Sequence, residues 1–403
     1  MIQILTLLLG PQALRRRWWL FGAFGTLWFA LGLFFFVNAM LDEFRIGHRW
    51  FAIPLLIDSA MTLVAIALTQ GTARRIRIIK VLVFLVLAAL LLTTRHSGII
   101  IGFIIGGALM ADASWRGTSA WVVRFQGWRV SLGYAVFEFI MGAWSLVPWP
   151  TYYEGEIGAD VGFLLMISAV NIMLNGYRLR RLPAVAPTSH PRGPRDEVAT
   201  VHVWTPTGGL PSPVQNMVSR YVAAVDASGN VSTGHAAFEL APDVYVSHYP
   251  AVEIDRSGAD FARVLRATAD NDVAGRWLPS YAEESGEWMA STFRIPMHGI
   301  DGTAVRAFWE LYRRDNTYNL TSRNCSSAVA RSLDAGIEGM FQPLADRPFF
   351  LLRLVLIPEI WVAGFIRQRA QAMAWTPGLV LDYARALTAI VALGQRWLDR
   401  KAG

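Results

Sequence analysis

Long apolar runs with few charges fill the first half of this chain. An α-helix needs about 20 consecutive apolar residues to cross the hydrocarbon core of a bilayer. The runs that approach this length lie at 18–40, 51–70, 77–94, 97–111, 130–149 and 161–177. We therefore expect a multi-span membrane domain of six helices within residues 1–182. The first run follows a cluster of arginines and lacks a clear cleavage site, so it is expected to remain as the first span.

Basic residues beside the apolar runs predict the orientation of the helices. Lys and Arg are enriched in cytoplasmic loops. They lie before the first run, after the second and fourth runs, and after the sixth, at Arg15, Arg16, Arg17, Arg74, Arg75, Arg77, Lys80, Arg116, Arg124, Arg129, Arg178, Arg180 and Arg181. These sides are expected to be cytoplasmic, and so is the soluble part that follows Arg181. Whether the later apolar segment 349–366 also crosses is left open.

Two features inside the apolar runs have competing interpretations. Gly98, Gly102 and Gly106 recur every four residues on one helix face, which permits close helix contact. We favour packing within the chain over the alternative, a homo-oligomer formed through this face. Asp58 and Glu138 are ionisable residues within apolar runs. A hydrogen-bonded structural pair is favoured over proton sensing.

The second half of the chain has the composition of a soluble domain. A linker with four prolines is expected at 183–200. Short strand-like runs follow, then segments with helical spacing, which together predict an α+β domain at 201–345. Apolar helices are expected at 346–403, either at the membrane interface or covering the domain, because Arg353, Pro358 and Glu359 interrupt the segment 349–366.

Composition limits the chemistry available to this domain. The net charge is +7, but many basic residues flank apolar runs, and no nucleic-acid motif is present. We expect no nucleic-acid partner. The chain has one cysteine, Cys325, so no internal disulfide and no cysteine-based zinc cluster can form. No metal and no cofactor are expected.

Cys325 is a candidate nucleophile because of the sequence around it. In the segment NCSSAVARSLDAG, small residues begin a predicted helix, with Asn324 or Cys325 at its cap. A thiol at a helix N-terminus is favoured as the thiolate by the helix dipole and by unpaired amides, which can also stabilise an oxyanion. The competing interpretation is an inert buried cysteine.

Two strand-like segments supply candidate partners for this thiol. His235 begins the segment HAAFEL, where its imidazole can face a thiol carried by a helix, and Cys with His is the minimum nucleophile pair. His248, in the segment DVYVSHYP, is expected to orient His235 as a third member. Glu239 is the alternative orienting residue, since it shares a strand face with His235. A satisfied core histidine remains the alternative for His235, and we interpret His202 and His298 as surface residues.

The membrane half has short spans, the phrase GLFFFVNAM at the end of the first span and the phrase NIMLNGYRL at the end of the sixth. In these features residues 15–182 resemble the HdeD-like family of six-span acid-resistance proteins. The resemblance implies a stress-linked membrane domain in a bacterial inner membrane.

The soluble half resembles the permuted papain-like thiol hydrolases, which include permuted relatives of NlpC-type peptidases and the lecithin:retinol acyltransferase group. GHAAFEL, YVSHYP and NCSSAVARSLDAG give the order of this family: a histidine, a polar orienting residue, then an Asn-Cys pair that opens a helix. The resemblance covers residues 200–340. It implies that Cys325 is the nucleophile, His235 the general base and His248 the third member. Ser-Ser-Ala follows the cysteine here, where the acyltransferase group has Glu-His.

These observations predict a membrane-anchored cysteine hydrolase of the peptidase or amidase type that acts through a Cys–His acyl-enzyme. One alternative is a thiol-dependent lipid acyl hydrolase or acyltransferase. The other is a non-enzymatic, HdeD-like membrane stress protein. The expected partners are the lipid bilayer and a peptide, amide or acyl-lipid substrate. The identity of the substrate, the physiological trigger and the oligomeric state do not follow from the sequence.

Overall fold

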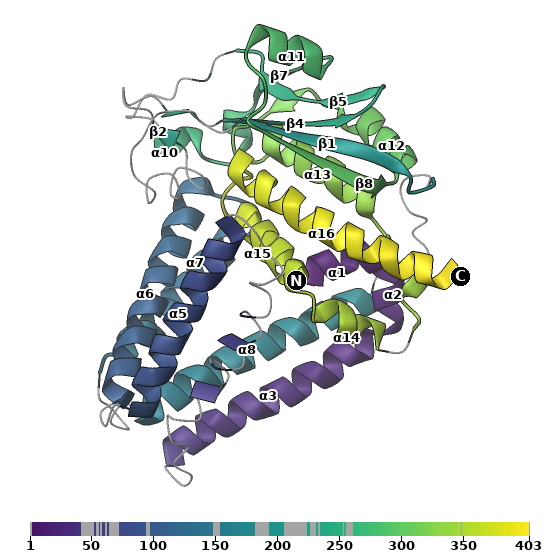
Figure 1. Ribbon diagram of the computed structural model, residues 1–403. Helices are drawn as coiled ribbons and strands as arrows, with labels where there is room; N and C mark the ends of the chain where they lie inside the picture. The colour runs from purple at the N-terminus through teal and green to yellow at the C-terminus, as the bar shows by residue number, and fades with distance from the viewer. Residues whose placement is uncertain are drawn as a thin grey trace. The chain divides into compact units, whose positions relative to one another are not determined.

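The computed structural model describes residues 2–41, 52–53, 56, 59–60, 63, 72–93, 97–147, 154–181, 193–204, 224–225, 231–232, 234–252, 254, 261–347 and 349–402. The chain divides into two compact units. The helical unit comprises Trp19–Gly117 and Gly133–Tyr177, and the mixed unit comprises Met1–Trp18, Thr118–Leu132 and Arg178–Gly403. Figure 1 shows the elements of both units. The protein is mostly helical, with small sheets in its C-terminal half.

The helical unit is built from helices that pack through glycines. Its helices are α3 (Trp18–Leu41), α5 (Thr72–Thr93), α6 (Ser97–Val123), α7 (Trp128–Trp144) and α8 (Glu154–Arg181). A Cβ atom at Gly32 would lie 2.7 Å from the carbonyl oxygen of Gly162, so α3 and α8 are in backbone contact there. Gly106 and Gly142 bring α6 and α7 together in the same way, at 2.7 Å. The face of Gly106 is therefore occupied by a helix of the same chain.

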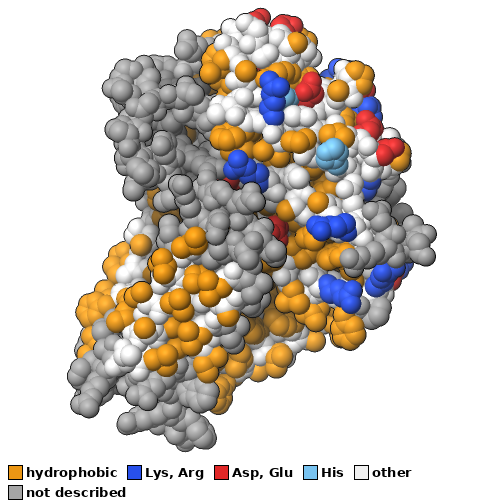
Figure 2. All heavy atoms as spheres, viewed as in Figure 1, with side chains coloured by type: hydrophobic (Ala, Val, Ile, Leu, Met, Phe, Trp, Pro, Cys, Tyr) orange, Lys and Arg blue, Asp and Glu red, His pale blue; other side chains and the backbone are white. Residues whose placement is uncertain are grey.

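The outer surface of the helical unit is apolar. On α3, large side chains such as Phe24, Leu27 and Phe34 are exposed. Figure 2 shows hydrophobic side chains gathered on this unit and charged side chains on the mixed unit. Among the residues that the structure describes, three helices are long and apolar enough to cross a membrane: α3, the part of α8 from Gly158 to Arg181, and α16 from Pro377 to Trp397. The second expected span, 51–70, lies largely outside the described residues.

Glu138 has a basic neighbour that its sequence context does not reveal. Its Oε2 atom lies 3.4 Å from Nε of Arg116, one of the basic residues at the end of the fourth apolar run. The other ionisable residue of the apolar runs, Asp58, lies outside the described residues. Asp160, on α8, accepts a hydrogen bond from the hydroxyl of Ser145. Glu138 and Asp160 thus each have a polar neighbour, which offsets part of their cost in an apolar environment.

The described residues of the mixed unit form three antiparallel sheets. The main sheet has four strands in the order β5-β4-β1-β8, the second has the order β6-β7-β9, and the third pairs β2 with β3. Their bounds are β1 Glu197–Trp204, β2 Ala224–Val225, β3 Val231–Ser232, β4 His235–Leu240, β5 Val244–Val246, β6 His248–Pro250, β7 Val273–Trp277, β8 Phe293–Ile300 and β9 Thr317–Tyr318. The segment DVYVSHYP, which the sequence presents as one strand, is divided at Ser247 between the main and second sheets.

The helices of the mixed unit lie on both faces of the main sheet. Their bounds are α1 Ile2–Leu9, α2 Pro11–Arg16, α10 Phe261–Val264, α11 Tyr281–Glu287, α12 Gly302–Tyr312, α13 Cys325–Ile337, α14 Phe350–Val355, α15 Pro358–Ala372 and α16 Pro377–Ala402, with short 3₁₀ turns at Ala269–Asn271 and Gln342–Leu344. In Figure 1, α13 and α16 cover one face of this sheet and α11 lies beyond the other. The apolar side chains of β4, such as Phe238 and Leu240, are fully buried.

The N-terminal end of the mixed unit differs from the domain bounds expected from the sequence, whereas 346–403 forms helices as expected. The first helix, α1, belongs with the C-terminal residues, because Gly339 and Phe341 donate backbone hydrogen bonds to Leu7 and Leu8 at 2.7 and 2.8 Å. Its apolar side chains are buried there. The segment 349–366 forms parts of two helices that meet at Pro358, and each is shorter than a span. Helix α16 packs on β8 and β1 and covers the main sheet. In its most apolar stretch, 67% of the residues are buried.

Candidate active site

Cys325 is the first residue of α13, and its position is fixed by a capping box. The side chain of Asn324 accepts a hydrogen bond from the amide of Ser327 at 2.8 Å, and the hydroxyl of Ser327 accepts one from the amide of Asn324 at 2.9 Å. The Asn324 side chain also donates to the carbonyls of Leu320 and Trp375. The cap therefore ties the start of α13 to two other segments, as predicted for an Asn-Cys pair that opens a helix.

The thiol of Cys325 is buried among hydrogen-bond donors. The backbone amides of Ala236 and Ser326 point toward the sulfur, and the hydroxyl of Ser326 lies 3.7 Å from it. Burial raises the pKa of Cys325, and these hydrogen bonds offset only part of that increase. The sequence predicted a thiolate stabilised by the helix N-terminus. That expectation is wrong for this state, because removal of the sulfur from water outweighs the donors around it.

His235 is the first residue of β4, directly before Ala236. It pairs with Trp204 of β1, and its ring stacks on Tyr249 with the ring centroids 4.1 Å apart. Its Nε2 atom lies 2.9 Å from the hydroxyl of Ser247 and 3.2 Å from a carboxylate oxygen of Glu284. Burial and the nearby His248 lower the pKa of His235 to about 3. The imidazole is therefore neutral at pH 7.

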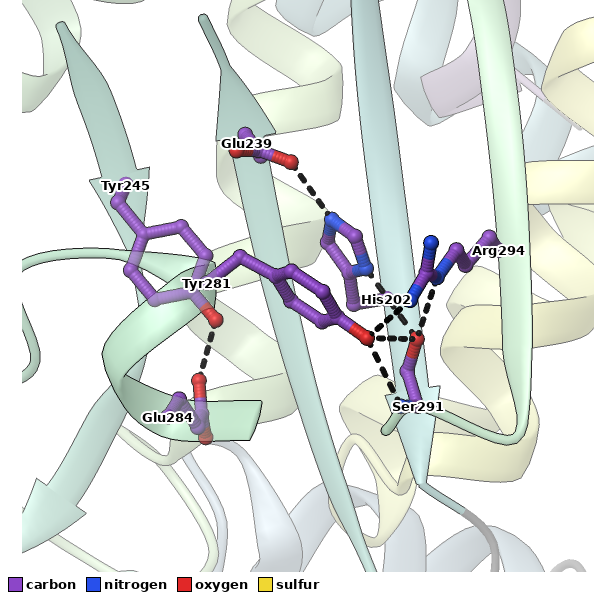
Figure 3. Close-up of polar contacts among 7 residues, drawn as sticks. All are labelled: His202, Glu239, Tyr245, Tyr281, Glu284, Ser291 and Arg294. Carbon is purple, nitrogen blue, oxygen red and sulfur yellow. Dashed lines mark hydrogen bonds and ion pairs between the residues drawn. The ribbon is translucent and has the colours of Figure 1, made fainter. Parts of the chain in front are cut away.

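Glu284, which sequence reasoning missed, supplies the carboxylate next to His235. It lies on α11, is only 1% exposed, and accepts hydrogen bonds from the phenols of Tyr245 and Tyr249. Figure 3 shows the contact with Tyr245. Burial and the neighbouring carboxylate raise the pKa of both phenols, so they remain protonated donors. Three partners thus satisfy a carboxylate that would otherwise be costly to bury.

His248 does not occupy the orienting position expected of it. Its ring stacks on Trp277 with the ring centroids 3.8 Å apart and meets Tyr318 edge-on. Neither ring nitrogen has a hydrogen-bond partner among the described residues. A Cβ atom at Gly275 would lie 2.3 Å from Nε2, so the ring fills the space above this glycine. The division of the strand at Ser247 is the reason, because it moves His248 into the second sheet.

Glu239 and His202 belong to a neighbouring polar network on the same sheet face. His202 Nε2 lies 2.8 Å from Glu239, and its Nδ1 lies 3.3 Å from the hydroxyl of Ser291. The phenol of Tyr281 accepts hydrogen bonds from the amide of Ser291 and from Arg294, at 3.1 and 2.6 Å (Figure 3). His202 is buried, which corrects its interpretation as a surface residue. Glu239 therefore has a partner other than His235.

The two networks meet on α11. Tyr281 stacks on His202 with ring centroids 4.0 Å apart, and Glu284, one turn later, reaches His235. Figure 3 shows both side chains projecting from this helix toward the sheet. Each network thus fixes α11 to the strands and so holds the Glu284 carboxylate in place. His298, by contrast, is exposed, as the sequence predicted.

Within the described residues, no hydrogen bond joins Cys325 to His235, and the sulfur lies instead beside the amide of the next residue, Ala236. Since the Nε2 atom of His235 contacts Glu284 and Ser247, Nδ1 is the nitrogen left to accept a proton. The arrangement therefore offers a neutral base, a carboxylate partner for that base, and a thiol beside two amides. No group of His, Cys, Asp and Glu among the described residues is suited to hold a metal ion.

Comparison with known proteins gives a match to part of the mixed unit. A family model described as the IcsB middle domain matches residues 248–354 of this chain. The matched segment extends from β6 into α14; it includes Glu284 and Cys325 and begins after His235. No curated protein matches the chain. No solved structure matches it.

Proposed function

We propose that this protein is a membrane-anchored cysteine hydrolase of the peptidase or amidase type, with Cys325 as nucleophile and His235 as general base. One observation carries the proposal. The Cys325 thiol lies beside the amide that directly follows His235, and Nε2 of His235 lies 3.2 Å from the buried carboxylate of Glu284. In this proposal α13 supplies the nucleophile, β4 the base and α11 the orienting carboxylate.

The neutral state of both groups determines how the reaction begins. Because the pKa of the thiol is raised and that of the imidazole is lowered, the resting pair is uncharged rather than an ion pair. His235 accepts the thiol proton as the sulfur attacks the carbonyl carbon of the substrate. The imidazolium formed is stabilised by Glu284, and the amides of Ala236 and Ser326 are suited to stabilise the oxyanion.

The second half of the cycle returns the enzyme to its starting state. Collapse of the tetrahedral intermediate breaks the carbon–nitrogen bond, and the imidazolium gives its proton to the departing amine. Water then attacks the thioester while His235 accepts a proton from it. The carbon–sulfur bond then breaks and releases the acid product, and the imidazolium of His235 returns the proton to the Cys325 sulfur. No redox partner is needed at any step.

The proposal includes a permuted papain-like fold for the mixed unit and six spans for the membrane domain. The papain-like fold is supported by the chain order, in which His235 precedes Cys325. It is also supported by the position of Cys325 as the first residue of α13. The proposal of six spans rests on the apolar runs and on the exposed apolar surface of the helical unit. An acyl-lipid substrate is the second candidate, and it is favoured by the presence of span-length apolar helices in the same chain.

The first test is the rate at which iodoacetamide labels the full-length protein in detergent between pH 5 and pH 9. We expect labelling to disappear in Cys325→Ser and to be slowed in His235→Ala. His202→Gln is the matched control, because it changes another buried histidine on the same sheet face. Equal rates in wild type and His235→Ala would contradict the proposal and favour a non-enzymatic membrane stress protein.

A further inference from the structure

The mixed unit has an apolar surface on α14 and α15 that the proposed catalysis does not use. Its side chains are Phe349, Leu352, Leu356, Trp361, Val362 and Phe365. Phe349 is 75% exposed and Phe365 is 65% exposed. Apolar side chains gathered in this way mark interaction sites rather than ordinary surface. We refer to these six residues as the apolar ridge.

The ridge is one continuous surface formed by two helices. Phe349, Leu352 and Leu356 recur at helical spacing on one side of α14, while Phe350 and Leu354 are buried on the other side. The indole of Trp361 donates a hydrogen bond to the carbonyl of Val355, at 2.6 Å. This contact joins the first turn of α15 to the end of α14. The apolar sides of the two short helices therefore form a single face.

The ridge lies where the chain approaches the membrane. Asp346, shortly before α14, accepts a hydrogen bond from Arg17 at 3.3 Å and lies 3.8 Å from Arg16. The span-length helix α3 begins at Trp18, the next residue. Arg180, at the end of α8, lies over the ring of Trp18 at 4.7 Å. Within the mixed unit, the ends of two span-length helices are thus tied together, and α14 is tied to the residues just before one of them.

The charges around the ridge fit a lipid surface better than an acidic or basic protein partner. Arg347 and Arg353 are exposed beside its apolar side chains. Arg16 is also largely exposed, at 77% of its side chain. Long basic side chains beside an apolar helix face can extend to lipid phosphates while their stems remain in contact with acyl chains. An apolar face bordered by Arg is typical of helices that lie in the plane of the membrane interface.

We propose that the apolar ridge is buried in the cytoplasmic leaflet of the membrane and thereby holds the mixed unit against an anionic lipid surface. Helices of this kind bury their apolar face by about 5–10 Å at the boundary of headgroups and acyl chains. The inference does not depend on the chemistry of Cys325. It predicts contact between lipid and specific side chains of α14 and α15.

The test places a fluorescent reporter on the ridge in the full-length chain. In a Cys325→Ser background, single cysteines are introduced as Leu352→Cys and Phe365→Cys and are labelled with nitrobenzoxadiazole. Leu311→Cys is the matched control, because Leu311 is an exposed leucine on α12 of the same unit. Each protein is placed, one chain per nanodisc, in phosphatidylcholine and phosphatidylglycerol, with or without lipid carrying a nitroxide near the top of its acyl chain.

We expect nitroxide lipid to quench the probes at positions 352 and 365 several-fold more than the probe at 311. Equal quenching at all three positions would overturn the proposal. A probe at 352 or 365 that is shielded from water but not quenched by lipid would also overturn it, because another protein surface would then cover the ridge. The two ridge positions lie on different helices, so each is an independent measurement.

Discussion

Glu284 illustrates how the energetics of one residue point to the site. A carboxylate that is 1% exposed is costly to bury unless hydrogen bonds replace its lost water. Two phenols and one imidazole provide those contacts here. The same contacts fix the ring of His235. The imidazole contact links Glu284 to the proposed general base, His235.

Glu284→Gln tests that connection at the scale of a single residue. The amide keeps the size of the side chain but removes the charge that stabilises the imidazolium. We expect the labelling rate of Cys325 at neutral pH to fall by about ten-fold or more, but by no more than the roughly 10²–10⁴-fold that the general base itself contributes. Glu283→Gln, an exposed neighbour on α11, should label at the wild-type rate.

The variant His248→Phe separates the two candidate orienting residues. The ring of His248 contacts aromatic side chains and has no hydrogen-bond partner among the described residues, so we expect its replacement to leave the labelling rate unchanged. If Cys325 were labelled more slowly in His248→Phe but at the wild-type rate in Glu284→Gln, the assignment would be reversed. His248 would then be restored as the third member of the site.

At the scale of elements, the sequence predicted those helices and strands that are determined by residues close together along the chain. The helix that begins at Cys325 and the strand His235–Leu240 were both predicted, because a capping box and an apolar strand run are local signals. The pairing of α11 with the sheet was not predicted. The segment YAEESGE has the composition of a solvated helix, and the burial of its Glu284 depends on Tyr245 and Tyr249, more than 30 residues away. The division of DVYVSHYP between two sheets is likewise invisible to alternation alone.

The start of α13 carries the prediction that belongs to this scale. Asn324→Ala removes the acceptor for the Ser327 amide and the donors for two carbonyls. Loss of an N-cap costs about 0.5–2 kcal/mol, so we expect local opening of the first turn to become easier by that amount. Hydrogen exchange at residues 325–328 measures it. Asn324→Asp keeps the acceptor but loses the donors, and should give an intermediate effect; unchanged exchange in Asn324→Ala would show that the cap is not needed.

At the scale of the whole molecule, the helix ends restrict the proposed membrane domain to an even number of crossings. Along α3 and α8, Gly25 approaches Met173 while Gly32 approaches Gly162, so the two helices are antiparallel. The guanidinium carbon of Arg180 lies 4.7 Å from the ring centroid of Trp18, so the ends of the two helices meet within the mixed unit. A chain that leaves and returns at the same place crosses the bilayer an even number of times, whichever intervening helices span it. Six spans satisfy this condition, and the basic residues at both ends favour the cytoplasmic side.

Reporter fusions test this arrangement. Alkaline phosphatase, active only outside the cytoplasm, is fused after Leu41, after Arg181 or at Gly403 of the intact chain. We expect activity only after Leu41, because α3 carries that residue across the bilayer, while Arg181 and Gly403 belong to one compact unit. A green fluorescent protein at the same positions should give the opposite pattern. Activity after Arg181 would place the mixed unit outside the cell. Activity at Gly403 alone would mean that one C-terminal helix crosses; the covering position of α16 on the main sheet argues against that outcome.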